Sequence, residues 1–598
     1  MTAFYENPEF VAPARIVSQQ HPDGSTVLQS RDPLGAYARC IGEWIEHWSR
    51  ETPDAPVLAE RRSSGDWRRL TWGQLRHAIG AVGQKLLDLG VSREQPVVIL
   101  SDNSIDHAVL MLATMHVGLA VCTVSSTYCR PGSDPSKVRA IVEALQPSLI
   151  YADDASRYGV TVTTCAGAAI QVFSEGADAV PGAMTFSGFL ETRETPAVMA
   201  AFMALKGDDV AKLLLTSGST GKPKVVVNTH RMLCANQQAL AQIWRFLDKE
   251  KPLLLDWLPW SHTFGGNHNL NLVLRNGGVL YIDDGRPAPE LIEKTVCNLQ
   301  EIRPNLHFNV PRGLDMLLPF LEADLDLARD VFSRLQLIFY AAAALNTTTW
   351  VRFETLSAQV RKEPLWLTTS WGATETAPLV TSAHFKLDGA GCIGVPLPGV
   401  ELKLIPSGEK HELRVRGISV FPGYRNAPEL SANAFDEEGF YKIGDAGCLV
   451  DPEDPSRGVV FDGRLAEDFK LSTGTWVSAG PLRLKLVAAL APLAADVVIT
   501  GHDRDEVGVL VFPSPVAEQV PAVEIANRIR QALKAFQLSG AGSSQLPRRV
   551  MLLTEPPDAD AGEITDKGYV NQRAVLARRA GEIVLLHADP LHPRVISL

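Results

Sequence analysis

The sequence lacks any Cys-x-x-Cys pair, and its eight cysteines are scattered along 598 residues. Closely spaced cysteine pairs mark many zinc sites, and dense cysteine frameworks mark small secreted domains held by disulfides. Neither pattern is present here. We therefore expect reduced thiols, no cysteine-based zinc site and a cytoplasmic location.

Positive charge is also scarce, because 57 lysines and arginines face 68 aspartates and glutamates, for a net charge of −11. The basic face that nucleic-acid-binding proteins present to phosphates is therefore not expected. The longest uncharged stretch, residues 108–124, is slightly short for a membrane span and contains His116 and Gly118. The N-terminal residues carry charges where an export signal needs an apolar core. We expect a soluble protein with no nucleic-acid partner and no membrane span.

What the sequence does contain is a regular alternation of helical and strand patterns. Residues 71–90 place apolar side chains at helical spacing. Short apolar strands are predicted at 97–100, 119–124, 148–151, 213–215, 279–282 and 335–340. This alternation predicts an α/β fold with parallel-rich sheets, in which ligands bind beyond the carboxyl ends of the strands.

The chain is too long for one core, so two or more domains are expected. After about residue 395, short strands joined by Pro/Gly turns predict a small barrel-like subdomain. Residues beyond Gly463-Arg464 have their own strands and helices and predict a small, mobile α+β domain. We place the boundary at Leu465–Glu467, which gives a large N-terminal domain, 1–465, and a C-terminal domain, 466–598.

The most informative segment is LLLTSGSTGKPK, at residues 213–224. A loop of hydroxyl, glycine and cationic residues lies between two apolar strands. The loop is too long for a plain hairpin turn. Such a loop can bring N–H groups and ammonium charge to a polyphosphate. It is not a Walker A loop, because Lys222 is followed by Pro223 rather than Ser or Thr. The expected phosphate contacts are Thr216, Ser217, Gly218, Ser219, Thr220, Gly221, Lys222 and Lys224.

Three later segments add candidate site residues. The segment SWGATETAP (370–378) offers the Thr374 hydroxyl to a phosphate and the Glu375 carboxylate to Mg²⁺. The small residues of FYAAAALN (339–346) form either a flat slot for an adenine ring or a tightly packed turn. His262, in DWLPWSHTFGGN (256–267), borders a ligand pocket or is a satisfied core residue.

These segments, in this order, resemble the acyl-adenylate-forming superfamily, which includes acyl-CoA and aryl-CoA synthetases, luciferase and the adenylation domains of peptide synthetases. The resemblance covers roughly residues 40–598. It implies an enzyme that uses ATP and Mg²⁺ to join a small-molecule carboxylic acid to AMP and passes the acyl group to a thiol, usually coenzyme A. It also implies an adenine turn at Ala342 and Ala343, an aromatic stack by Trp371 beside Gly372, and an acyl pocket bordered by His262.

The resemblance extends to the end of the first domain. Asp445, in FYKIGDAG (440–447), corresponds to the aspartate that accepts hydrogen bonds from both ribose hydroxyls. Arg464 corresponds to an arginine that contacts the ribose or phosphate. Relatives carry a Lys-Asp pair shortly after this arginine, where this chain has Ala466 and Glu467. A hinge only has to absorb backbone rotation, so we still expect it there.

Two C-terminal segments complete the resemblance. In LSTGTWVS (471–478), Gly474 and Trp476 would line the tunnel for the coenzyme A thiol in a second domain orientation. In GEITDKGYVNQRA (562–574), Lys567 matches the lysine that bridges the carboxylate and the α-phosphate. A lone loop lysine is otherwise a solvated charge.

The variants LSTGTWVS and GEITDKGYVNQRA most resemble feruloyl-CoA synthetases, which implies a hydroxycinnamic acid such as ferulic acid as substrate. Three alternatives stay open: a medium- or long-chain fatty acid as substrate, another fate of the adenylate (transfer to a carrier protein or oxidation by O₂), and a non-catalytic nucleotide-binding regulator. The presence of Lys567, Glu375 and Thr374 together argues against the regulator. The oligomeric state cannot be read, and a homodimer is left open.

Overall fold

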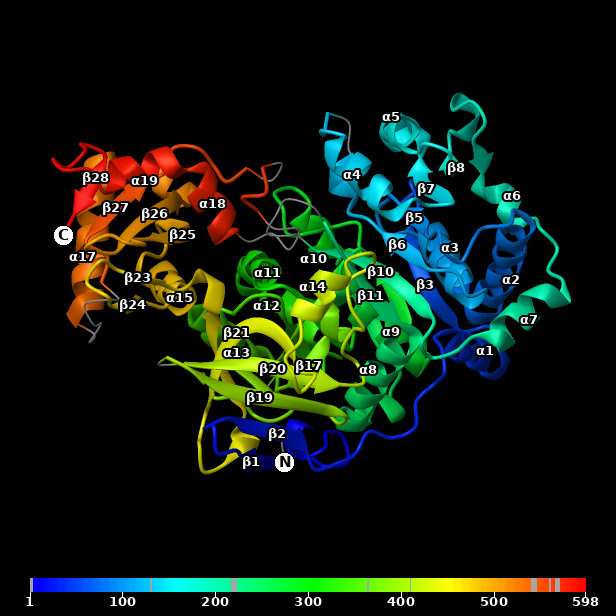
Figure 1. The fold of residues 1–598 in the computed structure, drawn as a ribbon, viewed down its shortest axis with the longest axis horizontal. Helices are drawn as coiled ribbons and strands as arrows, with labels where there is room; N and C mark the ends of the chain where they lie inside the picture. The colour runs from blue at the N-terminus through cyan, green and yellow to red at the C-terminus, as the bar shows by residue number, and fades with distance from the viewer. Residues whose placement is uncertain are drawn as a thin grey trace.

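The computed structural model describes residues 4–129, 132–216, 223–362, 365–408, 410–538, 546–558, 561–564 and 570–598. Four larger sheets and a two-stranded hairpin organise the chain. The elements of residues 466–598 gather at one end, in orange and red, and the helices of the first 200 residues lie at the other (Figure 1). This is an α/β fold with a large N-terminal part and a smaller C-terminal part, as the sequence predicts.

A seven-stranded sheet carries the segment that the sequence singles out. Its order is β11-β10-β6-β5-β7-β8-β9. The strands are β5 (Val97–Ile99), β6 (Val121–Thr123), β7 (Leu149–Asp154), β8 (Ile170–Glu175), β9 (Met184–Thr185), β10 (Val210–Thr216) and β11 (Lys224–Thr229). All neighbouring pairs are parallel except β10–β11.

Helices cover this sheet as the apolar spacing predicts. They are α2 (Trp72–Asp88), α3 (Ile105–His116), α4 (Ser136–Leu145), α5 (Ala155–Cys165), α6 (Phe186–Leu190) and α7 (Pro196–Ala204). Helix α2 begins with a capping box, in which the Thr71 hydroxyl accepts from the Gln74 N–H and the Gln74 side chain accepts from the Thr71 N–H. Gly90, just after it, has φ +66°, which suits glycine at a helix end. The helix predicted at 71–90 is therefore confirmed.

A second sheet of four strands has the order β12-β13-β3-β4. Its members are β3 (Pro56–Arg61), β4 (Trp67–Thr71), β12 (Leu253–Asp256) and β13 (Val279–Ile282). The helices α1 (Gly42–Glu51), α8 (His230–Ile243), α9 (Leu270–Asn276) and α10 (Ile292–Ile302) connect or flank its strands. The apolar residues of one face join those of the seven-stranded sheet in one core, and those of the other face pack in a second core with α10 and the helices of residues 311–360.

An eleven-stranded sheet has the order β1-β2-β19-β20-β21-β22-β18-β17-β16-β15-β14. The strands are β1 (Ile16–Gln20), β2 (Thr26–Ser30), β14 (Leu306–Asn309), β15 (Leu337–Tyr340), β16 (Trp366–Gly372), β17 (Leu379–Ser382), β18 (Cys392–Pro396), β19 (Val400–Ser407), β20 (Lys410–Gly417), β21 (Tyr441–Leu449) and β22 (Val459–Arg464). Only β14, β15 and β16 are parallel neighbours. They carry the helices α11 (Pro311–Ala323), α12 (Leu325–Phe332) and α13 (Thr347–Val360).

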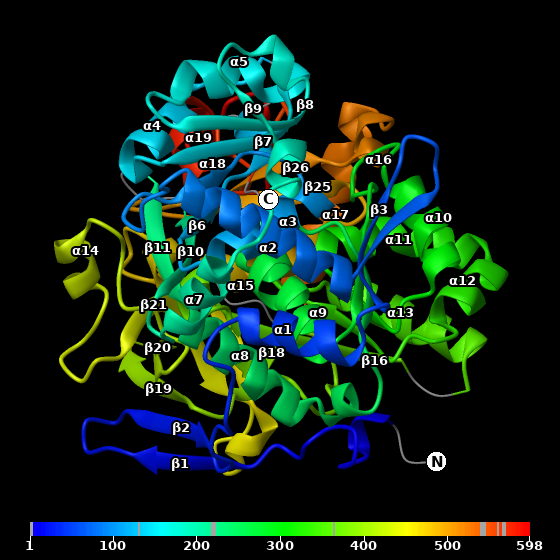
Figure 2. The same ribbon diagram turned by 90° about the vertical axis from the view of Figure 1, so that its right-hand side faces the viewer.

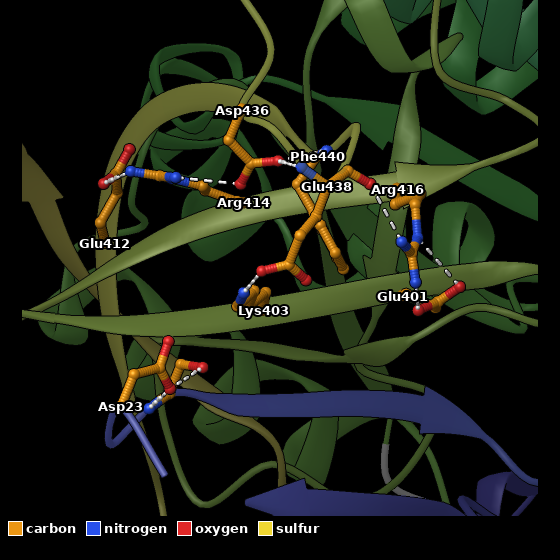
Figure 3. A network of polar contacts seen from close by, with 10 residues as sticks. Asp23, Glu401, Lys403, Glu412, Arg414, Arg416, Asp436, Glu438 and Phe440 are labelled. Carbon is orange, nitrogen blue, oxygen red and sulfur yellow. Dashed lines mark hydrogen bonds and ion pairs between the residues drawn. The ribbon is translucent and has the colours of Figure 1, made fainter. Parts of the chain in front are cut away.

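The residues for which the sequence predicts a barrel-like subdomain form β18–β22, which are antiparallel strands of this sheet. The N-terminal hairpin β1–β2 extends it through the pairing of β2 with β19, at the bottom of Figures 1 and 2. Arg416 of β20 pairs with Glu401 of β19 across the two strands, and Arg414 of β20 pairs with Glu412 of its own strand and with Asp436 of the turn before β21 (Figure 3). The Arg414–Asp436 pair ties the turn that leads into β21 to β20.

The C-terminal part has its own sheet and its own core. The order is β25-β26-β27-β28, with β25 (Ala494–Thr500), β26 (Gly508–Pro513), β27 (Arg549–Leu552) and β28 (Val595–Ser597). The helices α15 (Ala479–Ala489), α17 (Ala522–Leu538), α18 (Gln572–Arg578) and α19 (Ala580–Leu586) pack around it, and β23 (Phe469–Lys470) pairs with β24 (Trp476–Val477). In the part of the chain that the structure describes, no helix is long and apolar enough to cross a membrane.

One buried ion pair crosses the segment where the sequence predicts the hinge. Residues Leu465–Glu467 form a short 3₁₀ helix, η8, directly after β22. Lys410 Nζ, from β20, lies 2.6 Å from Asp468 Oδ2, and the two side chains are 11% and 8% exposed. Lys410 also donates to the Asp462 carbonyl at 2.6 Å, and Asp468 accepts from the Ala479 N–H at the start of α15. The pair therefore ties the first residue after η8 to the N-terminal part.

We expect Lys410→Met to destabilise this junction by about 3–5 kcal/mol, because it leaves the buried Asp468 carboxylate without its cation. The double variant Lys410→Met/Asp468→Leu should recover most of that loss, since an apolar pair needs no counter-charge. Thermal unfolding of the three proteins measures both effects. Equal stability of Lys410→Met and the wild type would show that the pair does not hold the junction.

Candidate active site

The predicted phosphate loop connects the hairpin strands β10 and β11. These strands pair from Val210 opposite Thr229 to Thr216 opposite Lys224, so the first and last predicted contacts face each other at the end of the ladder. Ser217, Gly218, Ser219, Thr220, Gly221 and Lys222 lie outside the described residues. The loop therefore begins at Thr216, the carboxyl end of β10. Ligands of α/β folds bind beyond the carboxyl ends of the strands, so this is the place that the sequence predicts.

Tyr424 joins the cationic end of this loop to the predicted metal ligand. Its hydroxyl donates to Glu375 Oε1 at 3.1 Å. The Lys224 ammonium lies over its ring, 5.3 Å from the centroid. An isolated bridge between Val226 and Tyr424 holds the tyrosine beside β11. The carboxylate of Glu375 and the cation of Lys224 are thus organised around one aromatic ring.

Asn228 makes the second link between β11 and the 374–376 turn, which is a short 3₁₀ helix, η6. Its amide Nδ2 donates to the Thr374 carbonyl at 3.1 Å. Asn267 Nδ2 donates in turn to Asn228 Oδ1 at 2.7 Å. Sequence reasoning missed Tyr424 and Asn228, because neither stands in a segment that points to a ligand.

The environment of Glu375 fits a magnesium ion bound beside phosphates. The side chain is buried, at 8% exposure, and the neighbouring hydroxyls belong to Tyr424 and Tyr441. Burial, followed by the Glu375 charge, raises the pKa of both tyrosines well above its usual range, so they stay neutral donors. Mg²⁺ commonly takes one or two carboxylates plus phosphate oxygens and water. Among the described residues no group of three or more His, Cys, Asp and Glu could hold a metal ion by itself.

Asp445, predicted to hold the ribose, lies beside Arg464 and beside Trp371, the residue predicted to stack near the adenine. Trp371 Nε1 donates to Asp445 Oδ2 at 2.8 Å. Arg464 stands opposite Asp445 across β21 and β22, with its Nε 3.7 Å from Oδ1. The Asp445 side chain is 13% exposed, whereas that of Arg464 is 63% exposed. Trp371 therefore orients the carboxylate from the buried side, and the arginine approaches it from the solvent side.

Gly372 follows Trp371 at the end of β16, where the chain turns tightly. A Cβ atom here would lie 1.8 Å from the Pro378 carbonyl oxygen, so no other residue fits without moving the backbone. This close approach brings the η6 turn back against β16. It places Thr374 and Glu375 next to the strand that carries Trp371.

The predicted adenine turn follows β15, the parallel neighbour of β16. Ala342 has φ +77°, a left-handed conformation that costs a residue with a Cβ roughly 1–2 kcal/mol. Ala342 is half-buried and Ala343 is exposed. Strained backbone of this kind is concentrated at functional sites, which agrees with a ligand-facing turn.

His262 leads into a π-helical segment, η5 (Phe264–Asn269), before α9. A Cβ on Gly265 would lie 2.4 Å from the Leu258 carbonyl oxygen, so the segment folds directly onto the preceding turn. His268 stacks on Phe339 of β15, with centroids 4.9 Å apart, and burial lowers its pKa to about 4. Phe264 packs on the same Phe339 ring at 5.7 Å. The aromatic side chains of this segment thus pack against β15, which leads into the adenine turn, and all three rings are buried. We call residues 258–270 the aromatic wall.

The C-terminal candidates are not in contact with this cluster in the described residues. Gly474 has φ +81° in the turn between β23 and β24, and Trp476 is 50% exposed under the Lys470 ammonium. The turn is held within its own domain, through the Ser472 N–H bonded to the Arg504 carbonyl. Lys567 lies outside the described residues.

Comparison with protein families shows to which family the chain belongs. Residues 45–425, more than half of the chain, match the family described as AMP-binding enzyme, and residues 468–589 match the AMP-binding enzyme C-terminal domain. The chain belongs to the AMP-binding enzyme family. Its acyl-adenylate-forming class, predicted from the loop and the later segments, is thereby confirmed.

The relatives of this AMP-binding enzyme include ligases and reductases. The long-chain-fatty-acid–CoA ligase FadD15 of Mycobacterium bovis is 22% identical over 93% of this chain and 98% of its own length. A carboxylic acid reductase of Mycobacterium marinum is 25% identical over 91% of this chain, which spans only 50% of that reductase. Neither is a feruloyl-CoA synthetase, so the finer resemblance stays a prediction.

Solved structures share the fold of this AMP-binding enzyme. The A-PCP didomain of carboxylic acid reductase from Segniliparus rugosus, in complex with AMP, matches with a TM-score of 0.73 and 19% identity, covering 93% of this chain and 83% of that one. The anthranilate CoA ligase AuaEII, in complex with anthranoyl-AMP, matches with a TM-score of 0.71 and 18% identity, covering 92% and 98%. At these identities the likeness concerns the fold alone.

Proposed function

We propose that this AMP-binding enzyme is an ATP-dependent carboxylic acid–CoA ligase that forms an acyl-AMP and then an acyl-CoA thioester. The observation that carries the proposal is the placement of two mostly buried carboxylates, Glu375 and Asp445, on either side of the Trp371–Thr374 turn. Each is oriented by an aromatic donor, Tyr424 for Glu375 and Trp371 for Asp445. One suits a metal–phosphate group and the other a pair of ribose hydroxyls.

In the first step, the acid's carboxylate oxygen attacks the α-phosphorus of ATP, and pyrophosphate leaves. Both partners are anions, so preorganised positive charge and donors lower the barrier. Lys224, the Thr374 hydroxyl and the loop N–H groups would hold the phosphates, and Lys567 would reach the α-phosphate and the carboxylate together. Mg²⁺, held at Glu375, would supply Lewis-acid neutralisation of the phosphate oxygens. Asp445 would fix the ribose and hence the position of the α-phosphate.

In the second step, the coenzyme A thiol attacks the acyl carbon, and AMP leaves with the electrons of the acyl–oxygen bond. Lys567 is not needed for this step, because no triphosphate is then present. Rotation about Leu465–Glu467 would remove it and bring the 471–477 turn to the site. The exposure of Trp476 and the open space beside Gly474 support a role of this turn in contacts outside its own domain.

A hydroxycinnamic acid such as ferulic acid is the proposed substrate. The likeness of residues 471–478 and 562–574 to the corresponding segments of feruloyl-CoA synthetases supports it. The FadD15 likeness favours a fatty acid as the second candidate. The reductase likeness favours delivery of the acyl group to a carrier protein instead of coenzyme A.

Pyrophosphate release from ATP and Mg²⁺, measured across hydroxycinnamic, benzoic and fatty acids with and without coenzyme A, tests the proposal. We expect turnover on hydroxycinnamates that accelerates when coenzyme A is added. Turnover only on fatty acids would replace the substrate and keep the mechanism. Adenylate formation that coenzyme A does not discharge would favour a carrier protein, and ATP binding without turnover on any acid would favour a regulator.

A further inference from the structure

Lys212, in the middle of β10, has a side chain that is entirely enclosed. It is 1% exposed and ranks among the largest fully buried side chains of the described residues. The flanking residues Ala211, Leu213 and Leu214 are buried apolar side chains. Burying an ammonium group is costly unless it is paired, so this lysine must make an interaction that compensates for lost hydration.

The Lys212 ammonium points at the candidate acyl pocket wall rather than at an acid. Its Nζ donates to the Gly266 carbonyl at 3.0 Å, inside the π-helical segment η5. Burial lowers the pKa of the Lys212 ammonium to about 7, and no carboxylate among the described residues raises that pKa again. The fit is close, because a Cβ on Gly266 would lie 3.2 Å from Nζ and 2.4 Å from the Trp260 carbonyl oxygen.

Other carbonyls of this wall also accept hydrogen bonds from polar side chains of surrounding elements. Asn103 Nδ2 donates to the Leu258 carbonyl at 2.9 Å, and Thr123 Oγ1 donates to the Trp260 carbonyl at 2.9 Å. Gln237 Nε2, from α8, donates to the carbonyls that follow Gly266, at 3.1 and 3.2 Å. Lys212 is the ionisable member of this set, and it holds the carbonyl of Gly266 itself.

The wall is coupled to the phosphate turn one residue further on. Asn267 Nδ2 donates to Asn228 Oδ1, and Asn228 Nδ2 donates to the Thr374 carbonyl. Asn267 also donates to the Thr263 hydroxyl at 3.1 Å. Gly266 itself is bonded to His262, because its N–H donates to the His262 carbonyl at 2.8 Å. A shift of Gly266 would therefore act directly on the segment proposed to border the acid, and only through Asn267 and Asn228 on the turn proposed to border the nucleotide.

We propose that Lys212 is a positioning residue for the acyl pocket: by donating to the Gly266 carbonyl it fixes the Gly265-Gly266 turn, and through that turn the wall that receives the carboxylic acid. This inference rests on the proposed function for its kinetic consequence. Its structural consequence, a rigid 258–270 segment, does not depend on the proposed function.

The test compares Lys212→Met, which removes the donor at similar length, with Lys212→Gln, which keeps a donor and removes the charge. Lys249→Met, which replaces a half-exposed lysine paired with Glu9, is the matched control. Amide hydrogen exchange of peptides spanning 258–270 is measured first, without substrate. We expect exchange to speed up by about tenfold or more in Lys212→Met, since the buried Gly266 carbonyl loses its donor, and to stay near the wild-type rate in Lys249→Met.

The kinetic measurement is pyrophosphate release, first with the acid varied at saturating ATP and then with ATP varied at saturating acid. We expect Lys212→Met to raise KM for the acid by about tenfold with KM for ATP within about twofold, and Lys212→Gln to restore most of the loss. Unchanged exchange in 258–270, or an equal rise of both KM values, would overturn the assignment. If Lys212→Met does not fold, the Lys212→Gln variant decides. A wild-type exchange rate of residues 258–270 in Lys212→Gln supports the donor role, and exchange of this segment at the rate of an unfolded chain contradicts it. Silence of the wild type on every acid would refute the proposed function while the exchange result still decides the role of Lys212.

Discussion

Lys567→Ala is expected to slow acyl-AMP formation by about 10²–10³-fold, the usual cost of losing one preorganised donor at a developing charge. Thioester formation from supplied acyl-AMP should stay close to the wild-type rate. The reason is electrostatic: the first step brings a carboxylate against a triphosphate, and the second brings a thiol against a mixed anhydride that has already lost pyrophosphate. A cation that spans the two anions matters only while both are present.

The two half-reactions can be measured separately, by pyrophosphate release without coenzyme A and by acyl-CoA formation from synthetic acyl-AMP. Lys534→Ala, which removes an exposed lysine on α17 of the same domain, controls for a general loss of positive charge. It should leave both rates unchanged. Equal losses in the two half-reactions of Lys567→Ala would contradict the role in adenylation and point to a structural defect of the C-terminal domain.

The elements that the sequence predicts well are those whose signal is local. The helix expected at 71–90 is observed at Trp72–Asp88, because apolar spacing, a capping box and a terminal glycine all act within the segment. The strand expected at 97–100 is observed at Val97–Ile99 for the same kind of reason. The α/β class follows from adding such segments together.

The candidate site is predictable only where a motif carries it. Thr374, Glu375 and Asp445 stand out by resemblance, but the partners that orient them do not. Tyr424 contacts Glu375 across 49 residues, and Asn228 contacts Thr374 across 146. Whether residues so far apart in the sequence come into contact depends on how the strands are arranged in the fold. The residue pattern within either segment does not indicate that arrangement.

Lys212 shows a different limit of sequence reasoning. The run Leu213-Leu214-Leu215 identifies a buried strand, and a lysine just before such a run is ordinarily an edge residue whose charge reaches water. Here the strand continues back to Val210 and buries the ammonium under the π-helical wall. The glycine pair that makes room for it lies 54 residues away, so neither segment by itself predicts the contact.

Asp445→Ala is expected to weaken ATP binding by roughly 10- to 100-fold, because hydrogen bonds to an ionised acceptor contribute about 1.5–3 kcal/mol. KM for the acid should change little, since the carboxylate lies beside Trp371 and Arg464 rather than beside the aromatic wall. The alanine also leaves the buried indole N–H of Trp371 without its acceptor, so part of the effect would be a loss of order at the end of β16.

Two variants separate these contributions. Asp445→Asn keeps an oxygen for the Trp371 N–H but carries no charge and presents only one acceptor atom, so it should lose most of the ATP affinity while retaining wild-type stability. Trp371→Phe removes the donor and keeps the carboxylate, so it should weaken ATP binding less than Asp445→Ala does. Calorimetric titration with ATP, together with thermal unfolding of each variant, distinguishes them. Wild-type affinity in Asp445→Asn would exclude the carboxylate as the ribose acceptor and would leave Asp445 as a structural partner of Trp371.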